Sequence, residues 1–360
     1  MKRTLTLIAA AAIVAACCNN PYEGAIILES QGEFAVGGQV ITREGEFDGH
    51  KFVGWNEQDE AGQNYRCDHA MVHYQIPVKA NKLPLVYVHG FGGSGLCWET
   101  TPDGHDGLST LMLRKRYSAY VMDLPGHGRA DRTSATVTVE PVASEQFWFN
   151  VWRFGEWPNY NEGVQFASDP DYLDQFFRGC GWDLSGGNVG LQIAAVNALG
   201  DKIGDHIQLH HSAGAVPGWF AAASNEHVKA VVSYEPGACV FPESEMPEPI
   251  PGLTGGTAGI PIPMEQFMRL TQIPIVLYFG DYIPADVNDV SDKLGNENWR
   301  VRLAMSRKFV DCVNAHGGNA ELVILPEIGV YGNTHMLMQD LNNDVLADLL
   351  DKWITQNKLK

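Results

Sequence analysis

The sequence predicts an α/β protein with a mostly parallel central sheet and helices on both faces. Short, almost wholly apolar runs recur along the chain, as in strands that are covered on both sides. Segments long enough for a helix separate most of these runs, and this alternation is typical of parallel sheets. The composition, 45% hydrophobic and 19% charged over 360 residues, provides ample apolar material for a large core.

The apolar and β-rich runs, bounded by glycine and proline, define the expected strands. They lie at 25–41, 69–76, 83–90, 118–123, 206–210, 230–234, 275–279 and 321–325. The segments between or after them define the expected helices. These lie at 107–116, 188–199, 213–224, 300–315 and 345–356.

One segment, residues 145–183, breaks the alternation, and we name it the aromatic insertion. It holds twelve Phe, Trp and Tyr residues, far above the 10% aromatic content of the whole chain. A long insertion rich in large rings is either a lid over a pocket or a subdomain with its own small core. The two interpretations are compatible.

The first residues have the features of an export signal. Lys2 and Arg3 are followed by an apolar run that is too short for a permanent span of about 20 residues. The end of this run, Val14-Ala15-Ala16-Cys17, resembles a bacterial lipobox, which implies that residues 1–16 are removed and that Cys17 is lipidated. Ordinary cleavage after Ala16 is the alternative. Either route predicts a chain that is periplasmic or anchored to the membrane by lipid.

The charge argues against nucleic acid as a partner. The chain has 25 basic and 43 acidic residues, a net charge of −18, which repels phosphate backbones and anionic membrane surfaces. Loss of residues 1–16 removes two basic residues and no acid, and the net charge becomes −20.

The cysteines do not predict a metal site. Five lie in the body of the chain, so at least one is expected to be free, and their pairing cannot be read from spacing. No Cys-x-x-Cys or His-x-x-x-His spacing joins them, so neither zinc nor a cofactor is expected. The five are Cys67, Cys97, Cys180, Cys239 and Cys312.

Ser212 is the candidate nucleophile. It lies between an expected strand and a helix, where a tight turn lifts a serine out of the sheet. The pattern Gly-x-Ser-x-Gly is met only in part, because Gly214 is present and His210 stands where the first glycine would be. The alternative is that Ser212 merely caps the helix.

His335 is the candidate base, and two acids compete to partner it. It follows the last expected strand in a segment rich in Gly and Asn, so it can reach a nucleophile at the carboxyl edge of the sheet. Glu235 and Asp281 each follow a strand as well. Spacing does not choose between them.

The order Ser212, acid, His335 is that of the α/β-hydrolase superfamily, and two other stretches resemble that family over roughly residues 69–357. They are His89-Gly90-Phe91-Gly92-Gly93, which is similar to the oxyanion loop, and Asp123-Leu124-Pro125-Gly126-His127-Gly128-Arg129, which is similar to a turn of the family. The resemblance implies an α/β-hydrolase domain over 25–360 with the aromatic insertion at the usual lid position.

Three shorter stretches, at 98–104, 235–237 and 332–336, resemble a small branch of bacterial secreted esterases. In that branch the triad acid is a glutamate after the sixth strand, which implies Glu235 rather than Asp281. The resemblance implies acyl transfer from a small-molecule ester with an apolar portion. The backbone N–H groups of Phe91 and Ala213 are the expected oxyanion hole.

Two other classes of protein remain as alternatives. Gly90, Gly92 and Gly95 also fit a dinucleotide-binding fingerprint, with Asp123 as the ribose-binding acid of an NAD(P)-dependent oxidoreductase. Against it, Pro102 interrupts the helix that should follow, and Asp123 comes 28 residues after Gly95 rather than about 20. A surface lipoprotein of hydrolase fold that only binds its ligand is the second alternative.

Overall fold

The computed structural model describes residues 24–54, 59–253 and 255–360. The expected signal segment, residues 1–16, and Cys17 lie outside the described residues. Among the helices of the described chain, none combines the length and the apolar character needed to cross a membrane.

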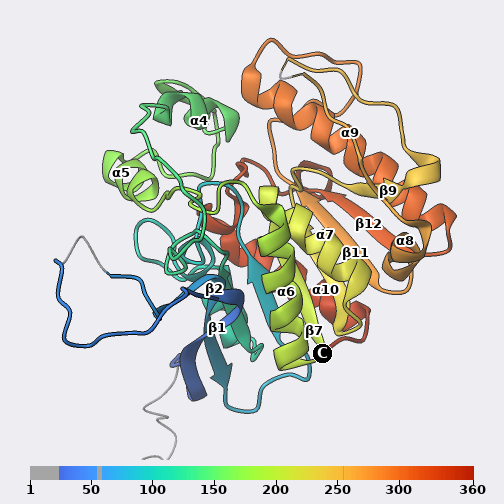
Figure 1. The fold of residues 1–360 in the computed structure, drawn as a ribbon. Helices are drawn as coiled ribbons and strands as arrows, with labels where there is room; N and C mark the ends of the chain where they lie inside the picture. Colours follow the sequence, from blue (N-terminus) through green and yellow to red (C-terminus); the bar gives the residue numbers. More distant parts are fainter. Residues whose placement is uncertain (1–23, 55–58, 254) are drawn as a thin grey trace, which may run out of the picture.

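An eight-stranded sheet organises the described chain, in the order β1-β2-β4-β3-β7-β8-β11-β12 (Figure 1). The β1–β2 and β2–β4 pairs are antiparallel and every other pair is parallel, which confirms the predicted sheet. Each expected strand is present. The bounds are β1 (Leu28–Thr42), β2 (Asn64–Pro77), β3 (Leu85–Val88), β4 (Ala119–Asp123), β7 (His206–His211), β8 (Val228–Tyr234), β11 (Pro274–Phe279) and β12 (Asn319–Ile324).

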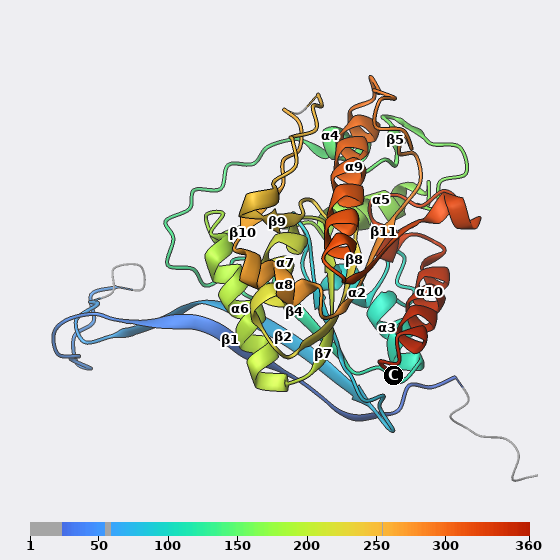
Figure 2. The same cartoon turned by 90° about the vertical axis from the view of Figure 1, so that its right-hand side faces the viewer.

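Helices cover both faces of the sheet, as Figure 2 shows from the side. The buried strand residues alternate between the faces. Leu85 and Tyr87 pack in one core with α3 and α10, whereas Val86 and Val88 pack on the opposite face with α6. The bounds are α2 (Leu96–Glu99), α3 (Leu108–Arg114), α4 (Glu145–Val151), α5 (Pro170–Arg178), α6 (Val189–Ile203), α7 (Ala215–Ser224), α8 (Met264–Leu270), α9 (Leu294–Ala315) and α10 (Asn343–Gln356).

The helices differ from the sequence prediction in several places, and the prediction did not include α2, α4 or α5. Helix α9 begins at Leu294, six residues before its expected start, and α8 was not among the expected helices. Helix α7 begins only at Ala215, because Ser212–Gly214 form a separate 3₁₀ turn. That turn carries the candidate nucleophile.

The aromatic insertion contains α4, α5 and two short strands, β5 (Gly155–Glu156) and β6 (Asn159–Tyr160). Its rings pack on one another: the Phe154 and Phe166 centroids are 4.0 Å apart, and those of Trp152 and Phe176 are 5.4 Å apart. Contacts of this kind stabilise a core. These rings are continuous with the core on the α3 and α10 face of the sheet, so the insertion packs onto the main domain and does not form a separate core.

Candidate active site

Ser212 occupies a sharp turn between β7 and α7. Its φ of +52° is unusual for a residue with a side chain and is typical of a strained nucleophile turn. Glycines make the turn possible. A Cβ at Gly214 would lie 2.2 Å from the carbonyl oxygen of His89, and one at Gly90 would lie 2.8 Å from the Cβ of Ser212. The partial motif therefore still forms the turn.

His210, which replaces the first glycine of the motif, is accommodated by a glycine elsewhere. Its buried imidazole lies edge-on to Trp219, with ring centroids 4.5 Å apart. A Cβ at Gly218 would come within 2.0 Å of His210 Nδ1. Burial lowers the pKa of His210 to about 3, so the ring is neutral at physiological pH. The glycine that makes room here is therefore Gly218 on α7, not a residue of the strand.

His335 and Glu235 form a buried pair. His335 Nδ1 lies 2.6 Å from Glu235 Oε2, and both side chains are almost fully buried. A carboxylate oxygen can only accept a hydrogen bond, so Nδ1 carries the proton. In the neutral imidazole Nε2 is then unprotonated, which is the tautomer that a general base needs.

The second oxygen of Glu235 accepts two more hydrogen bonds. Arg153 Nη2 donates to Oε1 at 2.5 Å and the backbone N–H of Gly280 donates at 2.8 Å. Arg153 belongs to the aromatic insertion and its side chain is fully buried. Because a buried carboxylate is costly unless it is paired and hydrogen-bonded, this set of donors offsets the burial of Glu235.

Asp281, the other candidate acid, contacts the loop that carries His335. Its Oδ2 accepts a hydrogen bond from the N–H of Gly332 at 2.8 Å, and its Oδ1 accepts one from the N–H of Tyr282 at 2.7 Å. Its backbone N–H donates to the carbonyl of Asn333. Of the two acids, Glu235 is the one whose carboxylate meets the imidazole.

The surroundings of His335 disfavour its protonated form. The pKa of His335 is lowered well below its ordinary value by burial and then by the positive charges of Arg153 and Arg302. The indole of Trp299 packs against the imidazole, with ring centroids 3.9 Å apart. His211 Nε2 donates to the carbonyl of His335 at 2.9 Å, which fixes the backbone of the loop.

The loop after β3 presents the backbone of Phe91 beside Ser212, the candidate nucleophile. His89 holds the loop: Leu124 N donates to its Nε2 at 3.1 Å, so Nδ1 carries the proton and donates to the Gly90 carbonyl at 2.9 Å. Burial lowers the pKa of His89 to about 4. Within the described chain, the N–H of Phe91 has no hydrogen-bond partner. It is available to a ligand.

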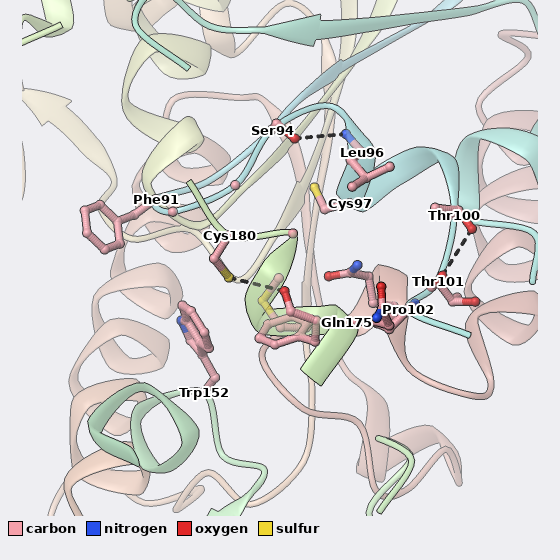
Figure 3. A pocket seen from close by; sticks show the side chains of 16 residues that line it. Phe91, Ser94, Leu96, Cys97, Thr100, Thr101, Pro102, Trp152, Gln175 and Cys180 are labelled. Atoms are coloured by element: carbon pink, nitrogen blue, oxygen red, sulfur yellow. Dashed lines mark hydrogen bonds between the residues drawn. The ribbon is translucent and has the colours of Figure 1, made fainter. Parts of the chain in front are cut away.

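Two cavities meet at this loop. Ser212, Ala213, Phe91 and His335 line one cavity of about 280 Å³. A smaller cavity of about 60 Å³, drawn in Figure 3, lies between the Phe91 loop and the aromatic insertion. Phe91 and Trp152 line both cavities. Trp148, Val151 and Trp152 of the insertion line the cavity of Ser212.

Comparisons with known proteins identify the family. No protein-family model matches the chain. A probable secreted lipase, phiG, of a fungal species (strain ATCC 74256) is 24% identical over 298 residues, which cover 75% of this chain and 81% of that protein. A novel bacterial esterase of known structure is 30% identical, with a TM-score of 0.73 over 93% of this chain and 98% of the esterase. The chain belongs to the α/β-hydrolase superfamily. Its relatives place it among the carboxylic ester hydrolases.

The dinucleotide-binding alternative is not supported by the structure of the hydrolase. Helix α2, which follows Gly95, has only four residues, too short to direct a helix N-terminus at a pyrophosphate. Asp123 is occupied within the protein: its Oδ1 accepts from the N–H of Gly95 at 2.6 Å and its Oδ2 from Arg129 Nε at 2.6 Å. These glycines and this acid shape the loop that carries Phe91.

Sequence reasoning missed three residues of the hydrolase site. Arg153 binds Glu235, and Arg302 lines the cavity of Ser212. Asp340 is fully buried and accepts hydrogen bonds from the N–H and Oγ1 of Thr334, next to His335. Asp340 follows Thr334 by six residues. Its closeness to the Gly/Asn-rich segment was the one signal that the sequence offered. The two arginines gave none.

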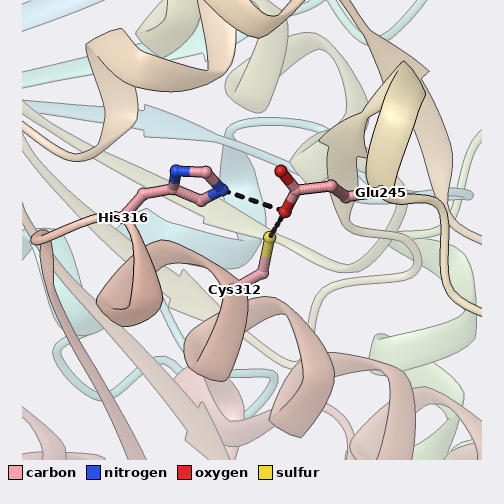
Figure 4. Close-up of side chains that lie close together, drawn as sticks. All are labelled: Glu245, Cys312 and His316. Atoms are coloured by element: carbon pink, nitrogen blue, oxygen red, sulfur yellow. Dashed lines mark hydrogen bonds and ion pairs between the residues drawn. The ribbon is translucent and has the colours of Figure 1, made fainter.

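One cluster of possible metal ligands lies outside the site, shown in Figure 4. His316 Nε2 donates to Glu245 Oε2 at 2.9 Å, and the Cys312 Sγ lies 4.0 Å from the same oxygen. Cys312 follows Arg302 by ten residues on α9, about 15 Å along the helix. All five body cysteines are free thiols.

Proposed function

We propose that this hydrolase cleaves carboxylic esters of small molecules by acyl transfer, with Ser212 as nucleophile, His335 as general base and Glu235 as the acid that orients the base. The observation that carries the proposal is the buried 2.6 Å pair of His335 and Glu235 at a cavity that Ser212 also lines. The esterase and lipase relatives support the same chemistry.

In the first step His335 Nε2 takes the Ser212 proton while Oγ attacks the ester carbonyl. Glu235 keeps the proton on Nδ1 and stabilises the positive charge that forms on the ring. The imidazolium then protonates the leaving alcohol, and an acyl-enzyme remains. Water activated by the same imidazole releases the acid and restores Ser212.

The negative charge on the carbonyl oxygen requires donors, and the N–H groups of Ala213 and Phe91 are the proposed oxyanion hole. Both residues line the cavity beside Ser212, and the first N–H groups of a helical turn have no partner within the turn. Each such donor contributes about 3 kcal/mol to lowering the barrier.

We further propose that residues 25–360 form the hydrolase domain and that the aromatic insertion is its cap. Trp148, Val151 and Trp152 of the insertion line the cavity of Ser212. These side chains suit an apolar portion of the substrate.

The nucleophile is tested by a fluorophosphonate probe, which reacts with activated serines. We expect the purified protein to be labelled and the Ser212→Ala variant to be unlabelled, with kcat for a short-chain p-nitrophenyl ester reduced about 10⁵–10⁶-fold. Ser94→Ala, at a serine of the neighbouring loop, is the control and should label like wild type. Labelling that persists in Ser212→Ala, or no labelling of wild type, contradicts the proposal and favours a protein that only binds.

The choice of acid is tested by amide substitutions. Glu235→Gln should lower kcat about 10³–10⁴-fold, because an amide can force the wrong tautomer on His335. Asp281→Asn should lower it about tenfold or less, because it weakens hydrogen bonds to the loop only. A larger loss in Asp281→Asn would reverse the assignment. Both variants are compared by p-nitrophenyl ester hydrolysis.

Arg153 is a positioning residue whose charge also sets the pH range of activity. Its positive charge helps to lower the pKa of His335, so wild type should keep the base neutral below pH 6.5. Removal of that charge in Arg153→Met raises the pKa, and the acid limb of kcat/KM should move to higher pH. The variant should also lose about 3 kcal/mol of unfolding free energy, because Glu235 is left buried and unpaired.

Two variants control this measurement. Arg153→Lys keeps the charge and should keep the acid limb near its wild-type position. Arg178→Met removes an exposed arginine of the same insertion and should change neither quantity. An acid limb that does not move in Arg153→Met would leave Arg153 a purely structural role.

Export is proposed from residues 1–16 and is supported by the likeness to a lipase named as secreted. Mass spectrometry of the mature chain should find a diacylglyceryl group on an N-terminal Cys17. An unmodified Cys17 at the N-terminus would indicate ordinary cleavage after Ala16. A chain that keeps residues 1–16 would contradict export.

A further inference from the structure

The cavity of Ser212 contains an arginine that has no acidic partner. Arg302, on α9, lines the cavity and is partly buried. Its Nη1 donates to the carbonyl oxygen of Asn298 at 2.8 Å and to the Asn298 Oδ1 at 2.5 Å, both neutral acceptors. Its Cζ lies 5.3 Å from the centroid of the Trp299 ring. In the part of the chain that is described, no carboxylate pairs with this guanidinium.

Neighbouring arginines show that acids are available to pair with. On the same helix, Arg300 is paired with Glu297 at 2.5 Å, and Arg307 lies 3.9 Å from Glu327. The chain as a whole has 43 acidic residues against 25 basic ones. Arg302 faces only neutral partners although acids are plentiful, and burial lowers its pKa. A perturbed charge of this kind in a cleft indicates a functional site.

The cavity as a whole carries one positive charge. Arg153 and Glu235 neutralise each other behind the imidazole. Among the described residues that line the cavity there is no aspartate or glutamate, and Arg302 is the one charged group that is cationic at every working pH. A substrate with one negative charge would neutralise the charge of Arg302.

The free edge of the guanidinium has the shape that a carboxylate recognises. Nη1 is used by Asn298, whereas Nε and Nη2 make no hydrogen bond with any described residue. These two N–H groups point the same way and can bind both oxygens of a carboxylate at once.

We propose that Arg302 binds a carboxylate of the substrate, so that the enzyme prefers esters that carry one negative charge in the acyl or the alcohol part. This inference rests on the proposed function of Ser212 and His335. The cavity of about 280 Å³ suits a compact molecule, and Trp148 and Trp152 provide apolar walls for the carbon chain between ester and carboxylate. A phosphate monoester, with a charge of about −1.5 to −2, would exceed the single positive charge.

Matched ester pairs test the proposal. On the acyl side, the mono-p-nitrophenyl ester of adipate is compared with p-nitrophenyl hexanoate; on the alcohol side, 4-acetoxybenzoate is compared with 4-acetoxybenzamide. The readout is the ratio of kcat/KM for the anionic and the neutral member, measured at pH 8, where His335 is neutral. Wild type should favour the anionic member of at least one pair by about 10–100-fold, the range expected for a charge-assisted hydrogen bond.

Variants assign this preference to Arg302. Arg302→Gln should lower the ratio about tenfold or more, and Arg302→Lys should retain part of it, since a point charge replaces a two-pronged donor. Lys also keeps the test valid if the Gln variant fails to fold. Arg307→Gln removes the same charge from the exposed side of α9, and its ratio should equal that of wild type. Equal ratios in wild type and Arg302→Gln, or a wild-type preference for neutral esters, would overturn the proposal.

A binding measurement separates this failure from that of the proposed function. If wild type hydrolyses neither member of any pair, ester hydrolysis itself is refuted. Calorimetry on Ser212→Ala still reports on Arg302: benzoate should bind more tightly than benzamide, and the difference should vanish in the Ser212→Ala/Arg302→Gln double variant. Equal binding of the two ligands, or tighter binding of phenyl phosphate than of benzoate, contradicts a carboxylate site.

Discussion

The buried carboxylate of Glu235 is the interaction on which the site depends. It accepts hydrogen bonds from three segments that are far apart in sequence: the backbone after β11 at Gly280, the aromatic insertion at Arg153, and the last loop at His335. An ionised group without water must be satisfied in this way. The position of one carboxylate therefore fixes the relative positions of the sheet edge, the insertion and His335.

The same requirement explains the local backbone. Glu235 itself has a φ of +42°, which turns its side chain back from the end of β8 into the protein. A side chain at position 280 would meet Oε1 of Glu235 at 3.1 Å and the carbonyl of Asn333 at 2.7 Å, so glycine is needed there. Strain at Glu235 and at Ser212 is held in place by the packed sheet beneath them.

The sheet and two of the site residues could be predicted because they depend on local pattern. Apolar runs marked the strands. Ser212 directly follows β7 and His335 lies in the loop after β12, and the carboxyl ends of these strands meet at one edge. The acid could not be chosen this way, because Glu235 and Asp281 follow the adjacent strands β8 and β11, and only their side-chain directions differ. A resemblance to known esterases, not spacing, favoured Glu235.

The two arginines could not be predicted for different reasons. Glu235, the partner of Arg153, is 82 residues away in sequence. In a segment of twelve aromatic residues, an arginine is also expected to face solvent. Arg302 lies within an expected helix, where a basic residue usually faces solvent. What distinguishes Arg302 is that no acid lies near it in the folded chain, and this cannot be read from the sequence.

The aromatic insertion is joined by hydrogen bonds to the loop that carries His335. Trp152 accepts a hydrogen bond from the N–H of His335, Gln165 donates to Gly332, and Tyr172 donates to Gln339. Lifting this segment away would break those bonds and strip Arg153 from Glu235 in the same movement. A state with the insertion lifted would thus leave Glu235 without its hydrogen bond from Arg153 and the N–H of His335 without its partner on Trp152.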